Sequence, residues 1–328
     1  MNENWRAFLA SRPAATGFPP AAVCDLSHLG LIRARGEDAA AFLQGQLTND
    51  TRLLGPERAQ LTATCSPKGR MLATLLAFVR DGDLYLQLPA ERLEGVLKRL
   101  RLFVLRAKVT LGDASDELAR LGLAGDFAAD VVGGALPPQP FGVAQRHGLT
   151  LVRLPGDPLR VEAIGPVDEV TALWREAEAA GAAVAGADWW ALLDIRAGVP
   201  TVLDATVEAF VPQMANLQLV DGVSFTKGCY TGQEVVARMQ YLGKLKRRMR
   251  YARVASPARP GDELWAPGSE SGQGAGKVVD ARPSPGGGSE LLAVVETASA
   301  AAGGVRLGGP DGPVLEFGPL PYALPDEG

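Results

Sequence analysis

The chain is poor in the residues from which proteins build metal and nucleophile sites. Its 328 residues include three cysteines and two histidines, and no two cysteines form a CxxC pair. Zinc ribbons and self-contained four-cysteine iron–sulfur sites depend on such pairs, so both are excluded, and no metal site is expected. Cys24, Cys65 and Cys229 are far apart in the sequence. Because their number is odd, a free reactive thiol is the chemistry that remains open. Neither His28 nor His147 stands in a recognisable motif.

Long apolar runs, a strong net charge and nucleotide fingerprints are missing as well. There is no uninterrupted apolar stretch of about 18 residues, which argues against a membrane helix. The opening MNENW has neither the basic nor the apolar region of a secretion signal. The formal net charge of -4 creates no general attraction to nucleic acid or membranes. We therefore expect a cytoplasmic protein without membrane or direct nucleic-acid partners. Since no coiled-coil repeat is present, we expect it to be a monomer.

The most informative segment that is present is KGCYTGQE at 227–234. Thr231 and Glu234 have capping-box spacing before an apolar run, which predicts a helix beginning at Thr231. Cys229 would then lie just before a helix N-terminus, two residues from Lys227, and both features favour the thiolate. The alternative is that the two glycines only shape a turn and that Cys229 is a small buried apolar group.

Alternating apolar runs predict an α+β fold with a loosely repeated βαββαβ pattern. The first copy has strands at 29–35, 59–65, 70–80, 84–88 and 104–111, with helices at 36–43 and after Pro89. The second has strands at 119–124, 148–154 and 159–164, with helices at 127–132 and 167–180. Short strand-like runs then follow at 250–254, 276–280 and 291–295, between turns rich in Pro and Gly. Such a pattern is typical of a small antiparallel barrel.

Several motifs together resemble one known family. They are FLQGQLTND at 42–50, CSPKGR at 65–70, DIRAGVP at 194–200, FVPQ at 210–213 followed by NL at 216–217, KGCYTGQEVVAR at 227–238 and PLPY at 319–322. In this order they resemble the YgfZ family, folate-binding proteins related to the glycine-cleavage T-protein. The resemblance spans nearly the whole chain. It implies two ferredoxin-like regions (1–112 and 113–243) and a C-terminal antiparallel β-barrel (244–328), arranged as a ring around a central opening as in the T-protein.

The resemblance also implies a function and several site residues. It implies a tetrahydrofolate-binding accessory protein for assembly or repair of iron–sulfur clusters in a subset of enzymes, including tRNA-modifying ones. Iron–sulfur client or assembly proteins would be its partners. Cys229 would be the reactive or cluster-contacting thiol, Lys227 would tune it, and Tyr230 would position a ligand. A single thiolate cannot hold a cluster with the usual four ligands, so any cluster contact would be shared or transient.

Trp190 falls at a folate-contacting position of the family, and an indole face can stack on a pterin. From the residues alone, core packing is the favoured explanation for both Trp189 and Trp190. Some relatives have a second aromatic wall near position 29, where this chain has Leu29. That departure bears on the affinity for folate.

Four further residues have groups suited to folate, each with a structural alternative. Glu208 suits the amino and ring N–H edge of a pterin, or is a surface glutamate. The other candidates are Gln213, Asn216 and Asn49, which suit amide recognition or simply order their loops and turns. Two basic regions, 244–250 and 98–108, either bind an anion or are ordinary charged surface, the first as a guarded strand edge.

A folate-dependent aminomethyl transferase, like the T-protein itself, is the alternative from the enzyme class. In that family the chemistry depends on an acid just after a glycine-rich turn. Here Leu72 and Ala73 occupy the corresponding places. Without an acid the transfer lacks its key group, so the transferase is disfavoured and a conventional enzyme is not expected. A scaffold with a vestigial folate pocket is the third possibility.

Overall fold

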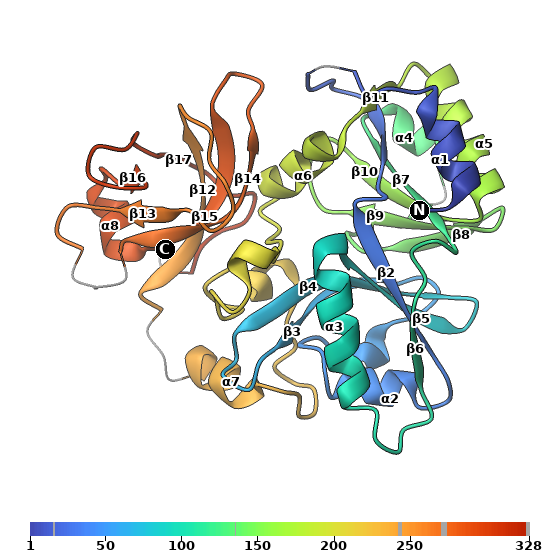
Figure 1. Ribbon diagram of the computed structural model, residues 1–328, viewed down its shortest axis with the longest axis horizontal. Coiled ribbons are helices and arrows are strands. Elements are labelled where there is room, and N and C mark those ends of the chain that lie inside the picture. Colours follow the sequence, from blue (N-terminus) through green and yellow to red (C-terminus); the bar gives the residue numbers. More distant parts are fainter. Residues whose placement is uncertain (16, 135, 242–244, 270–273, 326–328) are drawn as a thin grey trace. The chain divides into compact units, whose positions relative to one another are not determined.

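The computed structural model describes residues 1–15, 17–134, 136–241, 245–269 and 274–325 (Figure 1). The chain divides into two compact units. The first comprises Met1–Gln46, Asp50–Leu61 and Leu75–Trp190, and the second comprises Leu47–Asn49, Thr62–Thr74 and Ala191–Gly328. The first unit therefore combines segments from both of the expected ferredoxin-like regions, and the division at 112 and 243 stays a prediction.

A six-stranded sheet in the first unit has the order β11-β1-β7-β10-β9-β8. Its strands are β1 (Ala22–Asp25), β7 (Ala119–Ala124), β8 (Val143–Arg146), β9 (Leu149–Leu154), β10 (Arg160–Gly165) and β11 (Ala183–Ala185). Helices α1 (Glu3–Ala10), α4 (Phe127–Val131) and α5 (Val167–Ala179) lie together beside it (Figure 1). Trp5 and Trp174 are the largest side chains of the shared core. The expected strands β7, β9 and β10 are confirmed, whereas the N-terminal β1 joins this sheet without having been predicted.

A second sheet has the order β3-β4-β5-β2-β6. Its strands are β2 (Leu29–Arg35), β3 (Gln60–Cys65), β4 (Met71–Arg80), β5 (Asp83–Pro89) and β6 (Thr110–Asp113), and its helices are α2 (Ala39–Gln44) and α3 (Ala90–Leu102). The strand predicted at 104–111 is wrong for most of its length. Only residues from Thr110 onward find partners on β2, beginning with Arg35. Leu105, which the pattern placed in the strand, is 86% exposed.

The second unit holds a six-stranded antiparallel sheet that curls into a half-barrel, of order β16-β13-β14-β15-β12-β17. Its strands are β12 (Arg247–Val254), β13 (Glu263–Trp265), β14 (Gly276–Pro283), β15 (Ser289–Glu296), β16 (Arg306–Leu307) and β17 (Glu316–Gly318), with α8 (Thr297–Ala302) following β15. The three short strand-like runs of the sequence are confirmed as β12, β14 and β15. Alternate apolar side chains from these strands form its core, as the strand period requires.

Basic residues at the start of β12 are built into this unit. Lys244 lies outside the described residues. Residues 247–250 pair with β15 on one side, and on the other side the Met249 N–H donates to the Met214 carbonyl at 2.7 Å. Arg248 is 6% exposed. The interpretation of this run as a charge-guarded strand edge is therefore wrong for residues 247–250, because both sides of the strand are covered there.

Two further helices carry motif residues. They are α6 (Ala187–Arg196), which contains Trp190, and α7 (Gln233–Tyr241), which follows the cysteine motif. Among the described residues, no helix combines the length and the apolar character needed to cross a membrane.

Candidate functional site

Lys227 is a buried anchor beneath the cysteine loop. Its side chain is 6% exposed. The Nζ atom donates to the carbonyls of Leu47 at 2.6 Å and Asn49 at 2.8 Å, and lies 5.1 Å from the centroid of the Tyr230 ring. Hydrogen bonds from a charged donor are among the stronger ones in proteins. The ammonium group therefore fastens the motif to residues 47–49.

Residues 47–49, hereafter the strap, also form three hydrogen bonds with residues 221–224, the segment that leads into the cysteine motif. Thr48 Oγ1 donates to the Gly222 carbonyl at 2.7 Å, and Asn49 Nδ2 donates to the Asp221 carbonyl at 2.5 Å. The Ser224 N–H donates to the Thr48 carbonyl at 3.0 Å. The side-chain amide of Asn49 thus holds the loop in this structure, and its contact with folate stays a prediction.

Cys229 presents its thiol at the surface of the second unit. It is exposed, whereas Cys24 and Cys65 are buried. The interpretation of Cys229 as a buried apolar group is therefore wrong. Burial, and then the neighbouring Asp25, raise the pKa of the Cys24 thiol well above its usual range. Of the three thiols, Cys229 is the one that a partner can reach.

Tyr230 faces inward beside this exposed thiol. It is 7% exposed, and burial followed by the nearby Cys65 raises the pKa of its hydroxyl above the usual range. The phenol therefore stays protonated at neutral pH and supports the Lys227 side chain. Positioning of a ligand by Tyr230 stays a prediction.

The helix after the motif begins two residues later than expected. Thr231 precedes α7, and Glu234 is 88% exposed in its side chain and lies 3.8 Å from Arg238. The reciprocal cap comes instead from Gln233, whose Oε1 accepts from the Tyr230 N–H at 3.3 Å. The predicted Thr231–Glu234 capping box is therefore wrong, and an amide one position earlier takes its place.

Gly232 is needed where the motif meets the turn at 66–69. Its φ is +84°, and a Cβ there would lie 2.4 Å from the Ser66 carbonyl oxygen. At Gly228, by contrast, an added Cβ would meet nothing within 4 Å. We expect Gly232→Ala to lower the free energy of unfolding by about 3 kcal/mol, combining left-handed strain with overpacking. Urea titration of Gly228→Ala is the matched control, expected to stay within about 0.5 kcal/mol of wild type. Equal losses in the two variants would contradict the close approach.

Three proposed folate contacts lie in the second unit and have protein partners. Gln213 Nε2 donates to the Val236 carbonyl at 2.6 Å, and Asn216 Nδ2 donates to the Met249 carbonyl at 2.9 Å. Both side chains are buried, at 3% and 0% exposure. Glu208 is exposed with φ +57°, and its backbone carbonyl accepts from Arg70 Nη1 at 3.0 Å. As ligand contacts these residues stay predictions, while their visible bonds order the chain around the cysteine motif.

The DIRAGVP and PLPY motifs meet within the second unit. Tyr322 Oη donates to the Gly198 carbonyl at 2.8 Å, and a Cβ on Gly198 would lie 2.7 Å from the ring. Arg196 makes two 2.8 Å hydrogen bonds to the carboxylate of the buried Glu290. Burial opposes ionisation of this carboxyl, but the bonds from Arg196 and Tyr251 outweigh it and lower the pKa of Glu290 to about 2. Hydrogen bonds made by these motifs therefore hold the half-barrel against the segment that follows α6.

Trp190 lies in the first unit, where it is 2% exposed. Its six-membered ring packs on Gly122 of β7, at which a Cβ would lie 2.4 Å away, and the Arg160 guanidinium carbon is 5.1 Å from a ring centroid. Glu162 is directly across from Gly122 on β10 and is 1% exposed. Its Oε2 accepts from Gln87 Nε2 at 3.0 Å. The indole therefore packs against strand β7 and Arg160, and β10 also carries the buried Glu162.

The sequence patterns did not identify three buried polar residues near Trp190 as site residues. They are Glu162, Arg160 and Gln87. The available signal was a carboxylate and a guanidinium inside an otherwise apolar run at 159–164, which needs partners if that strand is buried. Nothing in the local sequence points to Gln87, which comes from a different sheet.

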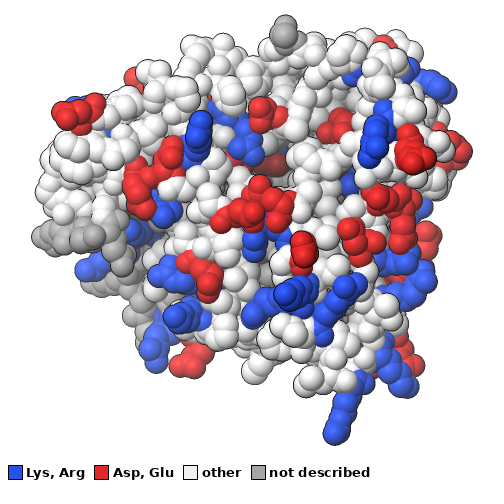
Figure 2. Space-filling view, viewed as in Figure 1, with Lys and Arg blue, Asp and Glu red and all other residues white. Residues whose placement is uncertain are grey.

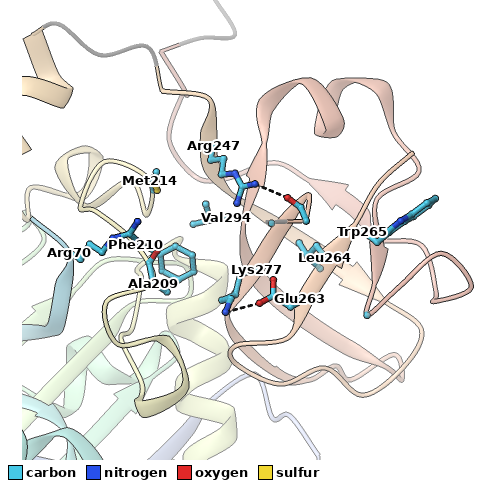
Figure 3. Close-up of a pocket in the computed structure, with 13 residues that line it drawn as sticks. Arg70, Ala209, Phe210, Met214, Arg247, Glu263, Leu264, Trp265, Lys277 and Val294 are labelled. Atoms are coloured by element: carbon cyan, nitrogen blue, oxygen red, sulfur yellow. Dashed lines mark hydrogen bonds and ion pairs between the residues drawn. The ribbon is translucent and has the colours of Figure 1, made fainter. Parts of the chain in front are cut away.

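A cavity of about 620 Å³ lies within the second unit (Figure 3). Phe210, Met214 and Arg70 line it together with half-barrel residues. Lys277 Nζ lies 2.8 Å from Glu263, and Trp265 points away from the other labelled side chains. Both apolar and charged side chains line this cavity, a combination that would suit an organic ligand with a charged end.

Comparison with known proteins supports the family resemblance. Residues 19–144 match the GCVT N-terminal domain. A protein of Colwellia psychrerythraea named tRNA-modifying protein YgfZ is 35% identical over 72% of this chain and 73% of its own length. The proteins of that name from Sodalis glossinidius and Yersinia pseudotuberculosis are 31% and 32% identical, over 95% and 98% of this chain and 96% and 98% of theirs. The chain belongs to the YgfZ family.

A solved structure supports the α+β fold independently. The glycine cleavage system aminomethyltransferase T from Bartonella henselae superposes with a TM-score of 0.73 at 19% identity, covering 97% of this chain and 89% of that protein. The family resemblance and the expected T-protein fold are thus confirmed. At this identity the likeness shows the fold and leaves the activity open.

Proposed function

We propose that this YgfZ-family protein is a tetrahydrofolate-binding accessory protein for assembly or repair of iron–sulfur clusters, with Cys229 as its reactive or cluster-contacting thiol. Its clients would include tRNA-modifying enzymes, as the name of its relatives suggests. The observation that carries the proposal is the exposed thiol of Cys229 on a loop anchored by the buried Lys227. Such rigid presentation suits a thiol that must meet a partner protein, rather than a core cysteine. In this arrangement Lys227 influences the Cys229 thiol by fixing the geometry of the loop that carries it.

Residues around Trp190 fit the chemistry of a pterin. A pterin has a flat face and an edge of amino and ring N–H donors, which suit an indole and a carboxylate such as Glu162. Trp190 is 2% exposed, so the side chains covering it must move to admit a ligand. When bound, tetrahydrofolate would supply a one-carbon carrier or reductant, while these residues would bind and orient it.

The transferase alternative gains no support from the fold alone. Leu72 and Ala73 lie in β4, and Ala73 is fully buried. Neither side chain has an ionisable group, so this pair cannot exchange a proton with an amine. We therefore keep the accessory role as the leading proposal.

Folate binding is tested with the two adjacent tryptophans. We expect Trp190→Phe to weaken tetrahydrofolate binding at least tenfold in titration calorimetry, because a smaller ring offers less stacking surface. Trp189→Phe is the matched control, since Trp189 is also buried and its Nε1 donates to the Pro19 carbonyl at 3.0 Å. No binding to the wild type at millimolar folate would remove the folate half of the proposal.

The thiol is tested in cells that lack the protein and carry an iron–sulfur client enzyme. We expect Cys229→Ala to lower restored client activity at least fivefold with the fold intact. Glu234→Ala, exposed in the same motif, is the control and should restore it fully. Full rescue by Cys229→Ala would reject the assignment to this residue and favour a scaffold.

A further inference from the structure

Residues 98–108, hereafter the α3-tip patch, combine exposed apolar and basic side chains. These eleven residues include five basic and no acidic ones. Leu102, Phe103 and Leu105 are 71%, 41% and 86% exposed, and they make up three of the seven exposed large hydrophobic residues in the described part of the chain. Clustered exposed apolar side chains mark interaction surfaces more often than single ones do.

The packing of α3 leaves the side chains of this patch exposed to solvent. Helix α3 buries Val96, Leu97 and Leu100, so its apolar face is already covered. At its end, Arg101 donates twice to the Leu111 carbonyl, at 3.1 and 2.7 Å, which fixes the loop that leads to β6. The exposed leucines are consequently a surface feature of a structured turn.

Charge on the patch is only partly neutralised from within the unit. Lys108 forms an ion pair with Glu37, and the Arg99 guanidinium carbon lies 5.1 Å from the Phe103 ring centroid. Among the described residues, neither Lys98 nor Arg106 has an acidic side chain within 4 Å. In Figure 2, the lower edge of the view, where Figure 1 places the end of α3 and the following loop, is mainly white with Lys and Arg colour projecting from it. The patch is thus locally positive on a chain of net charge -4.

We propose that the α3-tip patch docks a partner protein through a segment that is both acidic and apolar, such as an amphipathic helix rich in Glu and Leu. Complementary charge steers such a partner, and the leucines supply the desolvated contact. RNA fits less well, because two of the three apolar side chains are aliphatic and cannot stack like aromatic rings. A membrane fits less well, because the apolar face of α3 is buried and three side chains give little insertion area. A second copy would bring like charges together. The inference depends on neither folate nor Cys229.

The test uses a fluorescent 18-residue acidic amphipathic peptide of Glu and Leu, with a scrambled peptide of the same composition. We expect the wild-type protein to bind the ordered peptide at least tenfold more tightly than the scrambled one. Leu105→Ser and Lys98→Glu should each weaken binding at least tenfold, with unchanged melting curves. Leu53→Ser is the matched control, because Leu53 is also in the first unit and is 51% exposed. No binding by wild type, or an equal loss in Leu53→Ser, would overturn the proposal.

Three parallel measurements test whether the patch binds RNA, a membrane or a second copy of the protein instead. A tRNA transcript, vesicles with 30% anionic lipid, and the protein alone in sedimentation are each compared between wild type and Leu105→Ser. Leu105-dependent binding to RNA or vesicles, or a Leu105-dependent dimer, would overturn the proposal by reassigning the patch. Absence of all three, together with peptide binding, would support it.

Discussion

One thiol of the native protein should react rapidly with Ellman's reagent, and three should react after unfolding. Cys229 is exposed, whereas Cys24 and Cys65 are 1% and 0% exposed. A buried thiol reacts only when the structure opens, and its raised pKa keeps Cys24 protonated in the meantime. With opening free energies of several kcal/mol, the buried thiols should react at least about 10³-fold more slowly.

Substitution of each cysteine identifies the fast phase. Cys229→Ser should abolish it, and Cys24→Ser or Cys65→Ser should leave its amplitude at one equivalent if the variant folds. Mass spectrometry of the labelled peptide provides a second readout that needs no variant. Label on Cys24 or Cys65 within the fast phase would show that the burial described for them is not maintained in solution.

Lys227→Met should loosen the cysteine loop and lower the free energy of unfolding by about 3 kcal/mol. The substitution removes an ammonium that binds two backbone carbonyls in a buried position. A buried acceptor that loses a charged donor carries the full cost of its desolvation. The stability measurement is urea titration of the whole protein.

Hydrogen exchange localises the effect. The Ser224 N–H, which donates to the Thr48 carbonyl, should lose protection in Lys227→Met because the strap is released. Lys68→Met is the control, since Lys68 is an exposed lysine of the same unit. If both variants behave alike, or if exchange at Ser224 is unchanged, Lys227 is not the anchor described above.

Most elements of the fold could be predicted because their signals are local. Apolar alternation located β2, β3, β4, β7 and β10, and helical spacing of Val96, Leu97 and Leu100 located α3. The strand at 104–111 failed because a run of apolar letters cannot show whether a strand partner exists. At Leu105 none does, and the side chain faces solvent.

The sequence identified residues of the candidate site, but it did not predict how they are arranged in space. The motif predicted the importance of Lys227 and Cys229 from their types and spacing. Which group anchors and which is exposed depends on the strap, nearly 180 residues earlier, and no local pattern encodes that contact. Glu162 had a local signal, a carboxylate inside an apolar run, but its surroundings at Gly122 and Trp190 come from another strand and a later helix.

The strap has a bearing on how this architecture can be inherited. Residues 47–49 complete the second unit, although the segments on either side of them belong to the first. A gene fragment encoding 191–328 alone would leave the Lys227 ammonium without its two carbonyl acceptors. Recombination therefore cannot exchange the cysteine-bearing unit as a cassette. The two units must be copied and retained as a single evolutionary module.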